Sequence, residues 1–398
     1  MQANFTLLDV NDNSPYFPAS AVLRIEVRED TLLQEPVYIA HAIDIDAGNN
    51  GSVLYRLGND PDNLFDIDEY SGEVFLRSKL DYERRHSYEL VVVAEDQGAT
   101  GHRSSSMTLT VNVKDVNDNP PVFSRRLYDF YVSEDAHIGF EFGNVTATDA
   151  DSEHNGRVSY TLESSPYLSV FGIFTVQGVL NTRDSLDRES QDLYTLTVVA
   201  MDHGSPTPLS ATATIRIHIT DTNDNDPEFS RAEYKFSILE NQPRGSHIGQ
   251  VTASDRDAGD NQRLQYHFST PQTQFTINTY SGEVTTLVPL DREEQEDYTL
   301  RVYVTDSGEP ERSDSAIIRL SVLDENDNRP EFTVSGEHRV SVSENRPKGL
   351  RVMKVVAQDR DAGENGTVSF FMDPGESGVR FGSCFRTLAV ILFVFVLV

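Results

Sequence analysis

The chain has 398 residues, which is too long for one hydrophobic core of ordinary size. It carries 33 basic and 64 acidic residues, and the net charge of −31 excludes nucleic acid as a natural partner because phosphate binding needs a basic surface. The single cysteine, Cys384, excludes an intrachain disulfide framework. These totals leave two interpretations of the acids, a solvated acidic surface or a binder of cations.

Five landmarks recur along the chain. The Asn-Asp-Asn triplets begin at positions 11, 117, 223 and 326, so the steps between them are 106, 106 and 103 residues. The other landmarks keep a constant order: a glutamate that ends an alternating segment, an Asp-x-Asp pair, a Leu-Asp-x-Glu motif and an Asp-x-Gly segment. Repetition at this length predicts tandem domains rather than a solenoid of short units.

The predicted domains follow from these landmarks. Residues 1–13 are expected to be the end of a preceding repeat with its linker, and they do not resemble a signal peptide because no basic segment leads an apolar run. Complete repeats are expected at 14–119, 120–225 and 226–328, followed by an incomplete repeat at 329–380 and an apolar tail at 381–398.

Each repeat has the pattern of β-strands. Apolar residues occupy every second position at 109–113, 215–219 and 298–304, and polar residues mostly fill the positions between them. Period two with one apolar face predicts half-buried antiparallel strands. About seven short strands per hundred residues, broken by Gly, Pro, Asn and Asp, predict an all-β chain of tandem Greek-key β-sandwiches. Absence of Trp and of cysteine pairs argues against the antibody-type variant.

The acids gather where one predicted repeat meets the next. Around the second triplet the motifs would bring together eight carboxylates: Glu29, Asp81, Glu83, Asp115, Asp118, Asp149, Asp151 and Asp202. Each like-charged pair at about 4 Å would cost several kcal/mol, so these groups need a cation. Oxygen ligands without His or Cys favour Ca²⁺. An EF-hand is excluded because the sixth residue from Asp149 is His154 rather than glycine.

At this point the chain resembles the extracellular repeats of the cadherin superfamily, closest to Fat- and Dachsous-like cadherins or to protocadherins. The resemblance rests on the glutamates in V-S-E-D and L-E-N, the L-D-R-E type motifs, the D-x-N-D-N junctions, the D-x-D-A-G-x-N-G loops and the D-x-G segments, over roughly residues 5 to 370. It implies β-sandwich repeats stiffened by about three Ca²⁺ per complete junction, acting in calcium-dependent adhesion. It also implies another cadherin-like ectodomain as partner, homophilic or heterophilic, and a membrane-anchored parent on the outer side of the plasma membrane.

The resemblance carries a ligand set onto each junction. At the first complete junction, the first site would take Glu29, Asp81, Glu83 and Asp118. The second would share Glu29, Glu83 and Asp118 and add Asp115, Asp151 and the Val116 carbonyl. The third would take Asn117, Asp149, Asp151, Asp202 and the carbonyls of Asn119 and Asn155.

The other junctions match in part or in full. The next complete junction offers Glu134, Asp187, Glu189, Asp221, Thr222, Asn223, Asp224, Asn225, Asp255, Asp257, Asn261 and Asp306. The third offers Glu240, Asp291, Glu293, Asp324, Glu325, Asn326, Asp327, Asn328, Asp359, Asp361 and Asn365 but lacks a final Asp-x-Gly aspartate. The N-terminal junction has Asp9, Asn11, Asp12, Asn13, Asp44, Asp46, Asn50 and Asp96, so at best its third site is expected to be complete.

Two rival functions were weighed against adhesion. A metal-assisted enzyme needs an open coordination position and a nearby base, whereas the histidines lie at no repeated position, so we expect no enzyme and no catalytic residue. The alternative that stays open is a secreted calcium-dependent array that binds carbohydrate or another ligand. A stoichiometry of about one Ca²⁺ per domain would favour this ligand-binding array, and about three Ca²⁺ per junction would favour ions that hold neighbouring repeats together.

Two further features lie outside the repeat pattern. Residues 388–398 are wholly apolar but reach only about half the length of a spanning helix, so we interpret the tail as a truncated or misjoined gene model, with the start of a membrane segment as the alternative. Sequons begin at Asn4, Asn50, Asn144 and Asn365 and allow glycans in a secreted chain. Asn50 and Asn365 are expected to coordinate through backbone carbonyls and to keep their side chains free.

Overall fold

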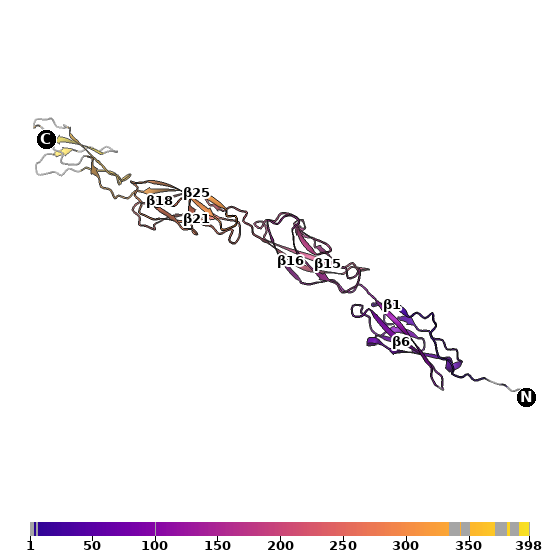
Figure 1. Cartoon of the computed structure of the whole chain (residues 1–398). Coiled ribbons are helices and arrows are strands. Elements are labelled where there is room, and N and C mark those ends of the chain that lie inside the picture. The colour runs from indigo at the N-terminus through magenta and orange to yellow at the C-terminus, as the bar shows by residue number, and fades with distance from the viewer. Residues whose placement is uncertain are drawn as a thin grey trace. The chain divides into compact units, whose positions relative to one another are not determined.

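The computed structural model describes residues 4, 7–99, 101–333, 343, 351–370, 380–382 and 390–397. Its contacts divide the chain into two compact units, Met1–Thr220 and Asp221–Val398, which are described separately. The described residues form strands and three short 3-10 helices, with no α-helix among them (Figure 1). The all-β fold class predicted from the alternating pattern is therefore confirmed.

The first unit begins with a seven-stranded sandwich. One sheet has the strand order β1-β7-β6-β3 and the other β2-β5-β4. The strands are β1 (Arg24–Arg28), β2 (Pro36–Ile39), β3 (Val53–Asn59), β4 (Phe65–Ile67), β5 (Glu73–Leu76), β6 (Ser87–Asp96) and β7 (Ser104–Lys114), with 3-10 helices η1 (Gly48–Gly51) and η2 (Pro61–Asn63). The predicted alternation places Leu109, Val111 and Val113 of β7 in the buried core between the sheets.

The second repeat of this unit has the same two sheets and one additional pair. Its sheets have the orders β12-β15-β16-β9 and β10-β14-β13, and β8 pairs with β11. The elements are β8 (Val122–Phe123), β9 (Leu127–Ser133), β10 (Glu141–Asn144), β11 (Ala147–Thr148), β12 (Ser159–Leu162), η3 (Pro166–Ser169), β13 (Phe171–Ile173), β14 (Val179–Thr182), β15 (Leu193–Met201) and β16 (Ser210–Thr220). Phe171, Leu180 and Ile217 are fully buried in its core.

The second unit begins with a third sandwich of the same design. Its sheets are β18-β25-β24-β21 and β19-β23-β22, with β17 paired to β20. The strands are β17 (Glu228–Phe229), β18 (Glu233–Leu239), β19 (His247–Gln250), β20 (Ala253–Ser254), β21 (Gln265–Phe268), β22 (Phe275–Ile277), β23 (Glu283–Thr286), β24 (Asp297–Thr305) and β25 (Ser313–Leu323). Its separate core contains Phe275, Val302 and Ile318.

Four more strands follow in this unit, in the sheet order β26-β27-β29-β28. They are β26 (Glu331–Phe332), β27 (Arg351–Gln358), β28 (Arg380–Gly382) and β29 (Val390–Leu397). The apolar C-terminal run thus supplies β29, which pairs antiparallel with β27. No helix among the described residues has the length and apolar character needed to cross a membrane. Cys384 and Glu344, the fourth glutamate of the repeat pattern, lie outside the described residues.

One kind of pairing differs from the sequence expectation. The first long strand of each repeat pairs in parallel with the last, as β1 with β7, β9 with β16 and β18 with β25. The antiparallel strands predicted at 109–113, 215–219 and 298–304 are present, since β7, β16 and β24 pair antiparallel with β6, β15 and β25. The additional parallel pairs were not predicted, because alternation fixes which side chains are buried but carries no information about the direction of a neighbouring strand.

Candidate metal sites at the repeat junctions

A glutamate anchors the upper side of each complete junction. Glu29 directly follows β1 and is 4% exposed. Its Oε2 accepts a hydrogen bond from the Tyr82 amide at 2.7 Å, and its Oε1 accepts one from the Val116 amide at 2.8 Å. One carboxylate therefore ties the Leu-Asp-Tyr-Glu loop to the junction segment that follows β7.

The same frame recurs in the second unit. Glu240, which is fully buried, accepts the amides of Arg292 and Glu325, each at 2.8 Å. In the first unit Glu134, 6% exposed, accepts the Arg188 amide at 2.8 Å. The Leu-Asp-x-Glu motif therefore always presents its x residue's N–H to this glutamate, which holds the motif's own glutamate beside it.

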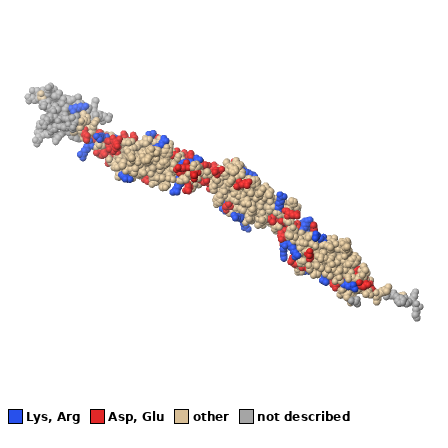
Figure 2. Space-filling model, viewed as in Figure 1, with Lys and Arg blue, Asp and Glu red and all other residues tan. Residues whose placement is uncertain are grey.

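Acids of the first complete junction meet in two overlapping groups. Glu29, Glu83 and Asp115 each offer an oxygen within 4.8 Å of the others, and so do Glu83, Asp118 and Asp151. Figure 2 shows acidic side chains concentrated at the ends of the repeats rather than over the sandwich bodies. The motif spacing predicted this convergence of residues from distant parts of the sequence.

Electrostatics at this cluster favour a cation. Burial is the largest cause that raises the pKa of Glu83, and together with the carboxylates of Glu29, Asp118 and Asp151 it brings this pKa to about 7. Burial followed by neighbouring acids also raises the pKa of Asp118. A bound divalent ion would remove both causes because it compensates the charge and replaces the lost hydration with direct coordination.

The Asp-x-Asp loop of the second repeat is fastened to the same junction. Asp151, 7% exposed, accepts the Asn119 side-chain amide at 2.7 Å and the Asn119 backbone N–H at 3.3 Å. In return, the Asn155 side-chain amide donates to Asp115 Oδ2 at 2.7 Å. These reciprocal bonds hold the lower ligands beside the upper ones.

Buried oxygens without a donor provide the sharpest test of a metal. Asn117 donates its amide to Asp202 Oδ1 at 3.4 Å and to the Thr207 carbonyl at 3.1 Å. Its own Oδ1 and the Oδ2 of Asp149 are buried and have no donor within the described part of the chain. The same pairs recur as Asn11 with Asp44 and Asn223 with Asp255. A buried acceptor left unpaired costs about 1–3 kcal/mol, so the repeated pair fits a cation ligand set.

The N-terminal junction keeps part of this arrangement. Asn11 donates to Asp96 Oδ1 at 3.0 Å, and Asn13 donates to Asp46 Oδ1 at 2.5 Å. Asp9 Oδ2 accepts from the Asn50 amide at 2.9 Å. The lower ligands are thus assembled as they are at the other junctions, and the expectation that only the third site is complete here stays a prediction.

Residues of the second complete junction are assembled within the second unit in the same way. Asp257, 2% exposed, accepts the Asn225 side-chain amide at 2.6 Å. Asp221 Oδ2 accepts the amides of Ala258 at 2.9 Å and Asn261 at 2.7 Å. Asp224 accepts from Asn225 at 2.7 Å. The loop that carries Asp255 and Asp257 is therefore fixed to the start of its own repeat.

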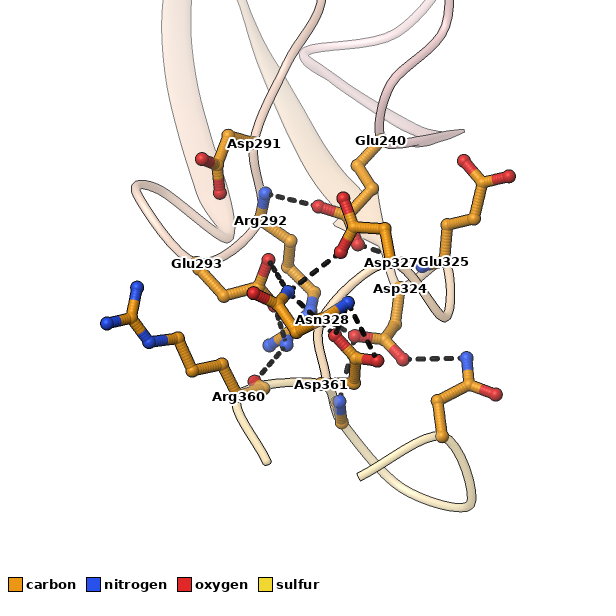
Figure 3. Close-up of polar contacts among 12 residues, drawn as sticks. Glu240, Asp291, Arg292, Glu293, Asp324, Glu325, Asp327, Asn328, Arg360 and Asp361 are labelled. Atoms are coloured by element: carbon orange, nitrogen blue, oxygen red, sulfur yellow. Dashed lines mark hydrogen bonds and ion pairs between the residues drawn. The ribbon is translucent and has the colours of Figure 1, made fainter. Parts of the chain in front are cut away.

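The third junction contains a cation that the sequence analysis missed. Glu240, Glu293 and Asp324 form the upper group, with oxygens within 4.8 Å of one another. The Arg292 guanidinium lies among them (Figure 3), donating to Glu293 Oε1 and, at 2.6 Å, to Asp324 Oδ1. Asp361, 8% exposed, accepts the Asn328 amide at 2.7 Å. This arginine is the third residue of the L-D-R-E motif at 290–293, but the sequence analysis gave a role only to the motif's aspartate and glutamate.

The structure corrects the expectation for the asparagines of the sequons and shows how the aspartates of the Leu-Asp-x-Glu motifs are bonded. We expected Asn50 and Asn365 to have free side chains, but their amides donate to Asp9 and to Asp324 at 2.9 and 2.8 Å. The expectation was wrong because the loop geometry aims the amide at the junction aspartate. The aspartates of the Leu-Asp-x-Glu motifs are exposed, and each accepts a hydrogen bond from the backbone N–H three residues further on: Asp81 from Arg84, Asp187 from Ser190 and Asp291 from Glu294.

The comparison with protein families decides the assignment. The family model described as "Cadherin domain" matches residues 23–114, 128–220 and 234–323. The chain belongs to the cadherin family. These matches coincide with the three sandwiches, and the resemblance inferred from the junction motifs is confirmed.

Curated relatives share this cadherin sequence over most of the chain. Protein dachsous of Drosophila melanogaster is 41% identical over 387 residues, covering 94% of this chain and 11% of the relative. Protocadherin Fat 4 of Homo sapiens is 37% identical over 385 residues, covering 95% of this chain and 8% of the relative. The cadherin chain thus spans about a tenth of the length of these relatives.

Solved structures agree on the fold. The EC22-24 segment of mouse cadherin-23 has a TM-score of 0.66 and 31% identity, covering 78% of this chain and 99% of that one. The extracellular domain of protocadherin GammaB4 has a TM-score of 0.76 and 31% identity, covering 97% and 62%. The cadherin repeats described above are therefore of a kind seen in both cadherin and protocadherin ectodomains.

Proposed function

We propose that this chain is a calcium-stiffened segment of a cell-surface protein that acts in cell adhesion or recognition. The observation that carries the proposal is the buried, donorless oxygen pair that recurs as Asn11 with Asp44, Asn117 with Asp149 and Asn223 with Asp255. An incidental packing defect would not recur at the same place in three repeats. Cadherin repeats of the Dachsous, Fat and protocadherin type fit this role.

The first complete junction holds about three Ca²⁺ in this proposal. Glu29, Glu83 and Asp118 are shared between the first two ions, with Asp81 on the first and Asp115, Asp151 and the Val116 carbonyl on the second. The third ion takes the orphaned oxygens of Asn117 and Asp149, with Asp151 and Asp202. Calcium supplies positive charge to a cluster in which burial already disfavours ionised carboxylates. The acids accordingly have a structural rather than a catalytic role.

The proposed partner is another cadherin-like ectodomain. One of the similar solved structures is described as a cis-dimer of protocadherin gammaB7 EC3-6, with a TM-score of 0.68 and 29% identity. Ectodomains of this architecture therefore do associate with one another. We place the chain in a longer membrane-anchored protein, on the outer side of the plasma membrane, because its curated relatives are far longer than the segment that it matches.

Calcium stoichiometry and bead aggregation together test this proposal. Native mass spectrometry of the full chain at about millimolar Ca²⁺ should show several ions bound, approaching three for each complete junction. Beads coated with the chain should aggregate in Ca²⁺ and separate in chelator. About one ion per repeat would instead favour a ligand-binding array. Calcium binding without aggregation in any homophilic or mixed-partner assay would contradict the adhesive role.

A further inference from the structure

Two junctions of this chain share one backbone frame but have different side chains at the x position of the Leu-Asp-x-Glu motif, Tyr82 in one and Arg292 in the other. Glu29 accepts the amides of Tyr82 and Val116, and Glu240 accepts those of Arg292 and Glu325, all at 2.7–2.8 Å. Each frame holds three carboxylates within 4.8 Å of one another: Glu29, Glu83 and Asp115 in one, and Glu240, Glu293 and Asp324 in the other. The chain therefore contains its own comparison between a tyrosine and an arginine at the same position.

Tyr82 takes no part in the charge balance of its junction. Its ring contacts the His86 ring in a tilted arrangement, with centroids 4.2 Å apart and an interplanar angle of 48°, and packs against the core of the first repeat. Glu83 Oε1 is left buried without a donor among the described residues. The three carboxylates of this group keep their full repulsion unless a cation enters from solution.

Arg292 behaves in the opposite way. Its side chain is only 12% exposed, and its guanidinium donates to Glu293 and Asp324 on the upper side of the junction. It also donates to the Arg360 carbonyl at 2.7 Å, inside the Asp-x-Asp loop of the following repeat. Figure 3 shows the three contacts converging on one guanidinium. This single cation therefore links the loop, the junction segment and the next repeat, which are the parts that a metal would link.

A guanidinium and a metal ion compete for this position. Both need the outward lone pairs of Glu293 and Asp324, and two positive charges at contact distance repel strongly in a partly buried site. The Arg292 guanidinium also neutralises one of the three negative charges, which lowers the attraction for an incoming ion. Calcium can enter only if the guanidinium gives up these bonds and moves outward.

We propose that Arg292 is a built-in counter-cation of the third junction, which staples the junction in the absence of metal and must be displaced before Ca²⁺ binds. The proposal rests on calcium binding as the proposed function and specifies how that binding is regulated. The junction with tyrosine loosens fully in chelator and binds Ca²⁺ more tightly, whereas the junction with arginine stays partly ordered and binds it more weakly. A fall in Ca²⁺ would therefore loosen the two junctions in different ways.

The test uses the full chain and hydrogen exchange followed by mass spectrometry. Peptides covering residues 113–121 and 322–330 report on the two junctions during a titration of free Ca²⁺ from chelator upward. Arg292→Gln should lower the Ca²⁺ midpoint at 322–330 by about tenfold, equivalent to 1.4 kcal/mol. The same variant should speed exchange of this peptide in chelator, because Glu293 and Asp324 lose the guanidinium that donates to them. The two effects have opposite signs, which a general loss of structure would not produce.

Arg360→Gln is the matched control. It removes the same charge from the same junction, but the Arg360 side chain is exposed and points away from the carboxylates, and only its carbonyl contacts Arg292 (Figure 3). Its long-range effect is screened by salt, so the midpoint should move by less than about twofold. The reciprocal variant Tyr82→Arg should raise the midpoint at 113–121 and slow its exchange in chelator.

The outcomes separate the inference from the proposed function. If Ca²⁺ protects neither peptide in the unaltered chain, the proposed calcium binding is wrong and the inference falls with it. If Ca²⁺ protects both peptides but Arg292→Gln leaves the midpoint unchanged or raises it, the inference alone is overturned. Equal effects of Arg292→Gln and Arg360→Gln would also overturn it, because net charge rather than the staple would then explain the shift.

Discussion

Asn223 donates its side-chain amide to Asp306 Oδ2 at 3.1 Å, although the two residues are 83 positions apart in the sequence. It donates also to the Pro310 carbonyl at 2.6 Å, while its own Oδ1 is buried without a donor in the described chain. The nitrogen of this amide thus fixes the Asp-x-Gly loop, and its oxygen is left available to the proposed Ca²⁺. An aspartate would supply the oxygen but not the nitrogen.

Asn223→Asp is therefore expected to destabilise the third repeat in chelator by about 3 kcal/mol, because it places a second carboxylate against Asp306 at a position that is 5% exposed. The loss should shrink in Ca²⁺, which compensates the added charge. Chemical unfolding monitored with and without chelator checks both parts.

Asn278→Asp provides the control for that substitution. Asn278 Oδ1 accepts the amides of Tyr280 and Ser281, and Asp68 accepts the matching amides of Tyr70 and Ser71 in the first repeat. An aspartate is therefore suited to this position, and stability should be unchanged. A similar loss in both variants would contradict the role given to the Asn223 nitrogen.

Asp257→Ala should raise the Ca²⁺ midpoint of its junction by at least tenfold, about 1.4 kcal/mol, because Asp257 is a proposed shared ligand and also holds Asn225. Thr299→Ala, on the exposed face of β24, should have little effect. Limited proteolysis in millimolar Ca²⁺ should cut the first variant near residue 225 and spare the second. Equal cleavage would remove Asp257 from the ligand set.

The first junction should respond to pH through Glu83, whose pKa burial and neighbouring acids raise to about 7. An acid with a raised folded-state pKa favours folding when protonated, so this contribution is complete below about pH 4.5 and is lost as pH rises through about 7. In chelator the junction should be looser at pH 8 than at about pH 6, and Ca²⁺ should bind more tightly at pH 8 because binding needs the carboxylate.

Carboxyl ¹³C NMR in chelator measures this titration directly, and Glu83→Gln identifies the resonance. In that variant the pH dependence of the Ca²⁺ midpoint should largely disappear. Titration of Glu83 at its ordinary value near pH 4.3 would contradict the prediction.

Gly178→Ala should destabilise the second repeat by about 3 kcal/mol, because the position has φ +69° and an added Cβ would lie 2.3 Å from the Val145 carbonyl oxygen. Gly139 also has a positive φ, +88°, but nothing lies within 4 Å of its Cβ position. Gly139→Ala should therefore lose only about 1 kcal/mol, the cost of the backbone conformation. Calorimetry in Ca²⁺ compares the two, and equal losses would exclude the close contact as the cause.

Much of this molecule could be predicted from the order of its motifs. The alternation in β7 and β16 identified the buried faces, and the distant acids Glu29, Glu83 and Asp115 do meet at a junction. Their occupation by metal stays a prediction. Period-two patterns could not reveal the parallel pairing of β1 with β7, since direction leaves no trace in side-chain alternation.

The direction of individual side chains was the second feature that the sequence could not predict. The place of Arg292 among the carboxylates depends on where a long, flexible side chain finds its partners, and a motif does not specify this. The same holds for Asn50, whose amide is aimed at Asp9 by the loop that carries it. The spacing of the motifs predicted which backbone segments meet at each junction. The hydrogen bonds by which the junctions differ from one another could be identified only in the structure.

The parallel pairing of β9 with β16 extends from Leu127 with Thr214 to Ser133 with Thr220. Since both strands run in the same direction, the chain enters this sandwich at one end and leaves it at the other. A pull on the two ends therefore slides one strand along the other, and the ladder of hydrogen bonds resists as a set instead of opening one bond at a time. The parallel pairing of the first and last long strands in each repeat should therefore make each sandwich resistant to tension applied at its two ends.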